Sequence, residues 1–165
     1  VGDQRALMET ALADKDPLVR RAALGVLPKL AITPAAKTAY LSRMIADGTQ
    51  VEQQGALEVL GAIKTVEART ALAGYLDALD AGRLATPLHI DLVSAVQADG
   101  SRPLVRRLEA YQRKQQADAL IKAFRAAALE GGDARRGQQV FNQNPLAECT
   151  RCHAIRGRGA DVGPE

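Results

Sequence analysis

The sequence predicts an all-α protein built from stacked helix pairs, and three observations predict it. Apolar residues recur at helical spacing along most of the chain. Three capping residues stand directly before a proline, which is the order typical of a helix start. A stretch of ten residues also recurs in similar form 33 residues later, as happens where short helical units stack on one another.

Local signals divide the first part of the chain into helices. Asp16, Thr33 and Thr86 each precede a proline, whose fixed φ suits the first helical position. Thr49 and Glu52 have the spacing of a capping box. We therefore expect a succession of short helices from residue 3 to about 130. The glycines expected to end helices are Gly48, Gly82, Gly100 and Gly131-Gly132.

The apolar residues of these segments recur as they do on one side of a helix. No segment alternates as a strand would. The residues expected to share a face, helix by helix, are Val19, Ala23, Val26, Leu27 and Leu30; Tyr40, Leu41, Met44 and Ile45; Leu72, Tyr75, Leu76 and Leu79; Leu88, Leu92, Ala95 and Val96; Leu104, Val105, Leu108 and Tyr111; and Leu120, Ile121 and Phe124.

The internal repeat suggests how the helices are arranged. A shift of 33 residues places Leu18–Leu27 over Val51–Leu60, and a weaker third copy lies near Pro87–Val96. Helix pairs that cannot bury their apolar faces alone must stack, which gives an α-solenoid of about three helix pairs. The alternative is an unrelated helical bundle, in which the periodicity reports only amphipathic helices of similar length.

The segment from Asp16 to Leu24 resembles the HEAT-repeat family, in which an Asp-x-x-Val-Arg-x-x-Ala string opens the first helix of each pair. In the second copy, Glu52 and Gln53 stand where the family has Val and Arg. The resemblance implies HEAT-like stacking over residues 1–130. Such stacks present extended surfaces, so a protein partner on the solenoid is one expectation.

Composition excludes some classes of function. The net charge of +3 is spread over the chain, and Trp is absent, so we expect no binding of nucleic acid. No apolar run approaches the roughly 18 residues that cross a bilayer, so we expect no membrane span in this chain. Because the chain begins with Val1 and not Met, we expect a fragment or a processed product. The missing export signal then excludes nothing.

The chain changes character after Gly131-Gly132, and we place a domain boundary there, between residues 1–130 and 131–165. Asp133 is expected to cap a short helix that reaches about Phe141. Beyond Asn142 the sequence is rich in Asn, Pro, Gly and Arg. We therefore expect little regular structure in the last part of the chain.

Cys149, Cys152 and His153 form a Cys-x-x-Cys-His string twelve residues from the last residue. This spacing lets a protein bond both vinyl groups of a haem through sulfur while the imidazole ligates the iron. We therefore expect covalent haem c, with His153 as an axial iron ligand. No residue of this chain is predicted to be catalytic.

Cys149, Cys152 and His153 could also serve other chemistry. A structural zinc site needs four ligands, whereas the chain has two cysteines and two histidines, and His89 lies on a predicted solenoid helix. A thiol–disulfide pair also uses Cys-x-x-Cys, but usually opens a helix after a strand, and no strand is predicted before Cys149. A redox disulfide stays open as an alternative to haem. A further alternative is a protein-interaction scaffold that binds no haem, in which the string is unused or oxidised.

The flanking residues resemble the first half of a class I cytochrome c domain. Gly137 and Phe141 have the spacing of that family's Gly-x-x-x-aromatic helix, and Gly163-Pro164 stands where the family has a Gly-Pro pair. The resemblance implies that the carbonyl of Pro164 accepts a hydrogen bond from Nδ1 of His153, which would fix the ring and make it more electron-rich.

The longer segment between Phe141 and Cys149 resembles the haem domains that end large planctomycete-type dehydrogenases. In those proteins a propeller dehydrogenase domain precedes HEAT-like repeats and a terminal Cys-x-x-Cys-His domain. The resemblance implies an extracytoplasmic electron-transfer module, periplasmic or held at a membrane by parts outside this chain. Its partners would be the dehydrogenase domain and a downstream electron acceptor. A chain made without the haem-attachment machinery would lack the haem.

No Met or His follows His153, so a second axial ligand is missing and we expect the haem domain to be truncated. Met8 and Met44 are expected to be core residues, and His89 an ordinary histidine and not a distal ligand. The remaining candidates are arginines. Arg102, Arg106 and Arg107 are expected on a solvated helix face, and Arg151, Arg156 and Arg158 near the haem propionates or a partner's carboxylates.

Overall fold

The computed structural model describes residues 2–114, 117–160 and 162–163. These residues form nine α-helices and three short 3-10 helices, with no strand among them, which confirms the prediction of an all-α protein. The chain divides into two compact units, residues 1–131 and 132–165. None of the described helices is both long enough and apolar enough to cross a membrane.

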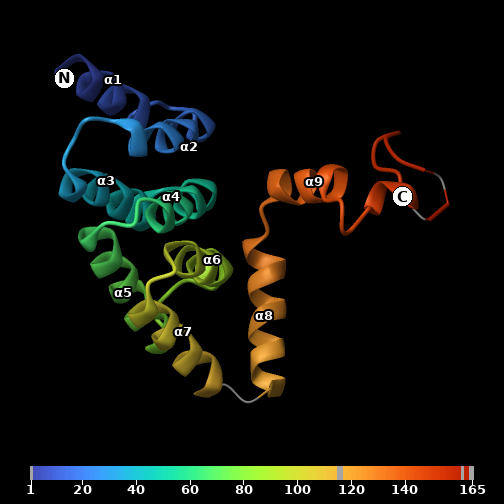
Figure 1. The fold of residues 1–165 in the computed structure, drawn as a ribbon. Helices are drawn as coiled ribbons and strands as arrows, with labels where there is room; N and C mark the ends of the chain where they lie inside the picture. Colours follow the sequence, from blue (N-terminus) through green and yellow to red (C-terminus); the bar gives the residue numbers. More distant parts are fainter. Residues whose placement is uncertain (1, 115–116, 161, 164–165) are drawn as a thin grey trace. The chain divides into compact units, whose positions relative to one another are not determined.

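The first unit consists of helices joined by short connections. Their bounds are α1 (Gly2–Leu12), α2 (Pro17–Val26), η1 (Leu27–Lys29), α3 (Pro34–Asp47), α4 (Gln50–Ala62), α5 (Val66–Asp80), η2 (Thr86–Leu88), α6 (His89–Asp99), α7 (Arg102–Lys114) and α8 (Ala117–Gly131). They lie in two rows. In one row α3, α5 and α7 contact one another in turn, and in the other α2, α4, α6 and α8 do so (Figure 1).

The core of the first unit draws side chains from both rows. Leu41 of α3 and Leu72 of α5 are fully buried, and so are Leu57 of α4 and Leu92 of α6. These residues belong to one continuous cluster. Met8 is also buried in it, and Met44 packs against it, which confirms the prediction that both methionines are core residues.

The predicted helix starts at Asp16, Thr33 and Thr49 are confirmed. The Asp16 carboxylate accepts from the Leu18 backbone N–H at 2.8 Å, and Thr33 Oγ1 accepts from the Ala36 N–H at 3.2 Å. Glu52 Oε2 accepts from the Thr49 N–H at 2.8 Å, which completes the capping box. These bonds satisfy N–H groups that have no partner within their own helix.

A helix does begin at Thr86 as predicted, but it begins with a 3-10 turn and Thr86 is not its capping residue. Thr86–Leu88 form the 3-10 helix η2, and α6 begins at His89. Ala85 occupies the capping position, so Thr86 lies inside the first tight turn and its side chain caps nothing. The Leu88 N–H donates to Ala85 O at 3.0 Å. Proline is tolerated here because the first turn of a helix does not need its N–H.

Two predicted apolar faces are also partly wrong. On α2, Val19 and Val26 are 40% and 49% exposed, whereas Leu24 is buried. On α8, Ile121 and Phe124 are exposed, while Ala127 is buried; the side chain of Leu120 lies outside the described part. The exposed positions on the two helices are thus occupied by larger β-branched and aromatic side chains.

Polar contacts between helices of the first unit recur at a nearly constant sequence separation of 30 to 34 residues. Three of the five join successive helices of one row, α2 with α4 and α5 with α7, whereas Arg69 with Asp99 joins α5 to α6 across the rows. The contacts are Arg20 with Glu52, Tyr40 with Glu9, Arg69 with Asp99, Arg107 with Asp77, and Lys114 with Asp80.

The second unit contains α9 (Ala134–Gln143) and the 3-10 helix η3 (Cys149–Arg151). Asp133 caps α9, because its Oδ1 accepts from the backbone N–H groups of Arg135 and Arg136 at 2.9 and 3.2 Å. The predicted capped helix is therefore confirmed. None of the residues of α9 is buried.

Candidate functional site

The Cys-x-x-Cys-His string forms one tight turn. Cys149 O accepts from the N–H of Cys152 at 3.3 Å and from the N–H of His153 at 3.0 Å. Glu148 begins the turn in the left-handed region with a φ of 43°. Two thiols and an imidazole are thus carried by a single helical turn.

Both thiols are free of disulfide bonding. Cys149 is half-buried, Cys152 is exposed and His153 is half-buried. Within the described residues, no group of three or more His, Cys, Asp or Glu side chains could hold a metal ion by itself. The turn therefore offers two sulfur nucleophiles and one imidazole, a donor set suited to a group that brings its own metal.

A short hairpin follows the turn. Ile155 and Arg158 exchange backbone hydrogen bonds at 2.9 and 3.1 Å. The two residues between them, Arg156 and Gly157, have φ values of 52° and 73°. Positive φ at both central residues is the geometry of a two-residue type I′ turn. This turn reverses the chain immediately after His153.

After the hairpin, the chain returns across the Cys-x-x-Cys turn. The Ala160 N–H donates to Thr150 O at 2.9 Å, and the Gly163 N–H donates to Cys152 O at 2.5 Å. These two bonds close a loop over the turn, with His153 inside the closed segment. The loop is held over the turn by main-chain hydrogen bonds.

Two glycines let the loop approach His153. A Cβ on Gly163 would lie 2.6 Å from Cε1 and 2.7 Å from Nδ1 of the His153 ring. A Cβ on Gly159, whose φ is 117°, would lie 2.1 Å from the His153 carbonyl oxygen. Both distances are too short for a real Cβ, so only glycine fits at either position. The Nδ1–Cε1 edge of the ring is therefore packed against backbone.

Sequence reasoning identified Gly163 but missed Gly159. The signal at Gly163 was its place beside a proline at a family spacing, whereas nothing in the local sequence indicates that residue 159 approaches a carbonyl oxygen six residues earlier. Pro164, whose carbonyl was predicted to accept from Nδ1 of His153, lies outside the described residues.

A cavity of about 670 Å³ lies between α9 and the hairpin. Gly137 and Phe141 of α9 line it together with Ile155, so the structure brings the two residues of the Gly-x-x-x-aromatic pattern onto one wall. Apolar surface in its lining is uncovered, because Ile155 is 47% exposed. This surface suits a large flat apolar group that covers it from outside.

Three arginines line the same cavity: Arg135, Arg156 and Arg158. Arg156 and Arg158 were predicted near a bound group, and Arg135 was not. Arg151 was predicted with them, but it does not line the cavity and instead pairs with Glu148 on its own turn. The cavity therefore combines an apolar wall with guanidinium groups, which favour carboxylates.

The other sequence candidates belong to the first unit. His89 is half-buried, and its Nε2 lies 3.0 Å from Leu84 O. Arg107 pairs with Asp77 of α5, whereas Arg102 and Arg106 are exposed on α7, as a solvated helix face requires. None of these residues is assigned a role in the turn of Cys149 to His153.

Comparisons with known proteins leave this site to be judged on its geometry. No family model matches the chain, and no match was found among curated proteins or among solved structures.

Proposed function

We propose that the second unit is a covalent haem c carrier that transfers single electrons. The observation that carries the proposal is the loop of residues 153–163, which places backbone against the imidazole of His153 beside two free thiols. A histidine ligand is commonly oriented by contacts to the nitrogen that does not bind the metal. The packing at the Nδ1 edge supports ligation through Nε2.

The residues have separate roles in this proposal. Each thiol of Cys149 and Cys152 would add across one vinyl group, with sulfur bonding to one carbon and the thiol hydrogen passing to its neighbour. His153 would provide one axial ligand. Phe141 and Ile155 would cover part of an apolar face. Bound haem would supply one-electron exchange between ferric and ferrous iron.

We propose that the first unit is a HEAT-like α-solenoid of about three helix pairs that carries the haem unit. Support comes from the two rows of helices and from polar contacts between α2 and α4 and between α5 and α7, whose partners lie 30 to 34 residues apart. This recurrence agrees with the 33-residue repeat of the sequence and is what stacking of equivalent pairs would produce.

The wider setting is part of the same proposal. Electrons would come from a dehydrogenase domain outside this chain and leave to a downstream acceptor. Haem attachment of this kind would place the protein outside the cytoplasm, in the periplasm or at a membrane. Oxidation of substrate is assigned to the other domain.

Export of the full chain to a bacterial periplasm that attaches haem c tests the proposal. We expect a Soret band and haem that stays with the unfolded polypeptide. The double variant Cys149→Ser with Cys152→Ser should lose covalent haem entirely, whereas Thr150→Ser, within the same turn, should keep it. An exported, folded chain without covalent haem would contradict the proposal.

A second candidate function is a protein-interaction scaffold that uses no haem. It is favoured by the outward face of α2, where Val19 and Val26 are 40% and 49% exposed. Uncovered apolar residues at helical spacing are suited to a protein partner. A partner captured by the full chain, lost with Val26→Lys and kept in the cysteine double variant, would support this candidate.

A further inference from the structure

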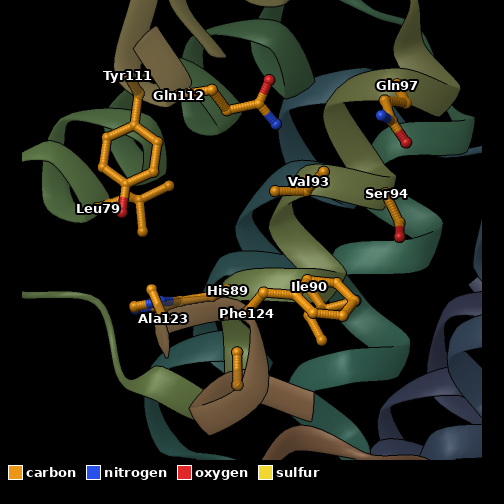
Figure 2. Close-up of a pocket in the computed structure, with 11 residues that line it drawn as sticks. Leu79, His89, Ile90, Val93, Ser94, Gln97, Tyr111, Gln112, Ala123 and Phe124 are labelled. Atoms are coloured by element: carbon orange, nitrogen blue, oxygen red, sulfur yellow. The ribbon is translucent and has the colours of Figure 1, made fainter. Parts of the chain in front are cut away.

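A second cavity, in the first unit, lies at the last helices of the two rows. It has a volume of about 330 Å³ and lies among α5, α6, α7 and α8. Figure 2 shows Tyr111 and Gln112 of α7 across the opening from Ala123 and Phe124 of α8, with Val93 of α6 between them. The sequence interpretation assigned nothing to this place.

The cavity exists because α8 is fixed at its end. Gln54 of α4 donates from Nε2 to Gly131 O, and Gln50 Nε2 donates to Glu130 O at 2.8 Å. A Cβ on Gly131 would lie 2.2 Å from Pro87 O, so this end of α8 lies directly against η2. Earlier in the helix, Phe124 is 62% exposed although it lines the cavity. The core is therefore incompletely closed there.

The lining defines the chemistry that the cavity accepts. Its floor is apolar, made by Leu79, Ile90, Val93 and Ala127. None of the described lining residues is Lys, Arg, Asp or Glu, so a bound ion would lose hydration with no opposite charge in the lining to replace it. An uncharged ligand avoids this penalty.

Neutral hydrogen-bonding groups surround the apolar floor. They are the hydroxyls of Ser94 and Tyr111, the amides of Gln97 and Gln112, and the imidazole of His89. Nε2 of His89 lies 3.0 Å from Leu84 O. Because a carbonyl oxygen can only accept, Nε2 donates in this bond. A ligand with a hydroxyl or carbonyl group would find partners here.

We propose that this cavity binds a small uncharged molecule with an apolar ring system and one or two hydrogen-bonding oxygen atoms. Its size and composition are those of small-molecule sites, which combine apolar walls with a few polar groups. Such a ligand would cover the exposed ring of Phe124. The site does not involve Cys149, Cys152 or His153, so it does not depend on the proposed haem.

Methyl-detected NMR titrations of the full chain test the site. The probes are 2-naphthol, which is neutral and has one hydroxyl, and naphthalene-2-sulfonate, which has the same rings and a negative charge. We expect 2-naphthol to shift the methyl signals of Ile90 and Val93 saturably while those of Ile45, outside the cavity, stay fixed. The sulfonate should bind at least about tenfold more weakly.

Matched variants on α8 locate the binding. Ala123→Phe fills the cavity and should weaken binding of 2-naphthol at least about tenfold, whereas Ala128→Phe, on the exposed part of the same helix, should leave it unchanged. Gln112→Leu, which retains the volume, should weaken 2-naphthol and not naphthalene. Circular dichroism confirms that each variant is folded.

Three results would overturn the proposal. One is the absence of saturable shifts at Ile90 and Val93 with 2-naphthol. Another is binding of the sulfonate as tightly as the naphthol, which would refute the chemical class. The last is unchanged binding in both Ala123→Phe and Gln112→Leu, which would place the probe elsewhere.

Discussion

At the scale of single residues, Gly163 lies directly against the His153 ring. Gly163→Val should force the loop away, because its Cβ would overlap the imidazole. We expect the free energy of opening the closed loop to fall by roughly 1–3 kcal/mol. Hydrogen exchange should show this as lost protection of the Ala160 amide, which donates to Thr150 O. Gly157→Asn is the control, since residue 157 faces open space and Asn tolerates positive φ. Equal protection in both variants would contradict the packing.

Glu52 is the residue whose charge the fold controls most strongly. The Arg20 guanidinium, followed by Thr49, holds the pKa of the buried Glu52 carboxyl at about 2, below its ordinary 4.5. A lowered folded-state pKa stabilises the fold above the unfolded-state value. That stability is lost as the pH falls from about 4.5 toward 2, and it amounts to about 3 kcal/mol.

The test of Glu52 is urea unfolding at pH 7 and pH 3. Glu52→Gln should lower the unfolding free energy at pH 7 by about 3 kcal/mol, because Arg20 loses its buried partner. Glu52→Gln should also reduce the loss of unfolding free energy between pH 7 and pH 3. Glu58→Gln, on the exposed side of α4, should change stability by less than about 0.5 kcal/mol. An unaltered pH profile for Glu52→Gln would refute the assigned pKa.

At the scale of elements, the crossing of α4 and α6 depends on Gly61. A Cβ at this position would lie 2.5 Å from Ala95 O and 2.7 Å from Ala95 Cα, so the two helices pack backbone to backbone. Gly61→Ala should therefore cost about 1–3 kcal/mol despite the better helix propensity of Ala. Gly74→Ala in α5, where nothing lies within 4 Å, should stabilise the protein by about 0.5–1 kcal/mol. Chemical denaturation measures the unfolding free energy of both variants. A change of the same sign in both would contradict the close backbone packing of α4 against α6.

The same scale explains which predictions succeeded. The caps at Asp16, Thr33 and Asp133 were predictable because each depends on a side chain and a backbone N–H two or three residues away. Which side of a helix is buried depends on its neighbours, so Val19 and Val26 were assigned to the wrong side. The turn at Cys149 was not predicted, because little regular structure was expected beyond Asn142, and the closeness of Gly159 to His153 depends on the path of the returning loop.

At the scale of the whole molecule, the division into two units has a consequence for stability. Of the described residues, those in the continuous core cluster all lie between Met8 and Leu108. The end of α8 adds Ala127 and the contact of Gly131 with Pro87. The core and its covering helix are therefore complete before the second unit begins.

A chain ended after Gly132 should fold by itself, with a Tm within about 3 °C of the full chain, because the shortening removes no part of the core. A chain ended after Lys114 lacks α8, exposes the side of α6 and η2 that Ala127 covers, and should lose roughly 2–4 kcal/mol with a less cooperative transition. Thermal melting followed by circular dichroism compares the three chains. If the chain ended after Gly132 melted at as low a temperature as the chain ended after Lys114, residues 133–165 would have to support the first unit. The two units would then not fold independently.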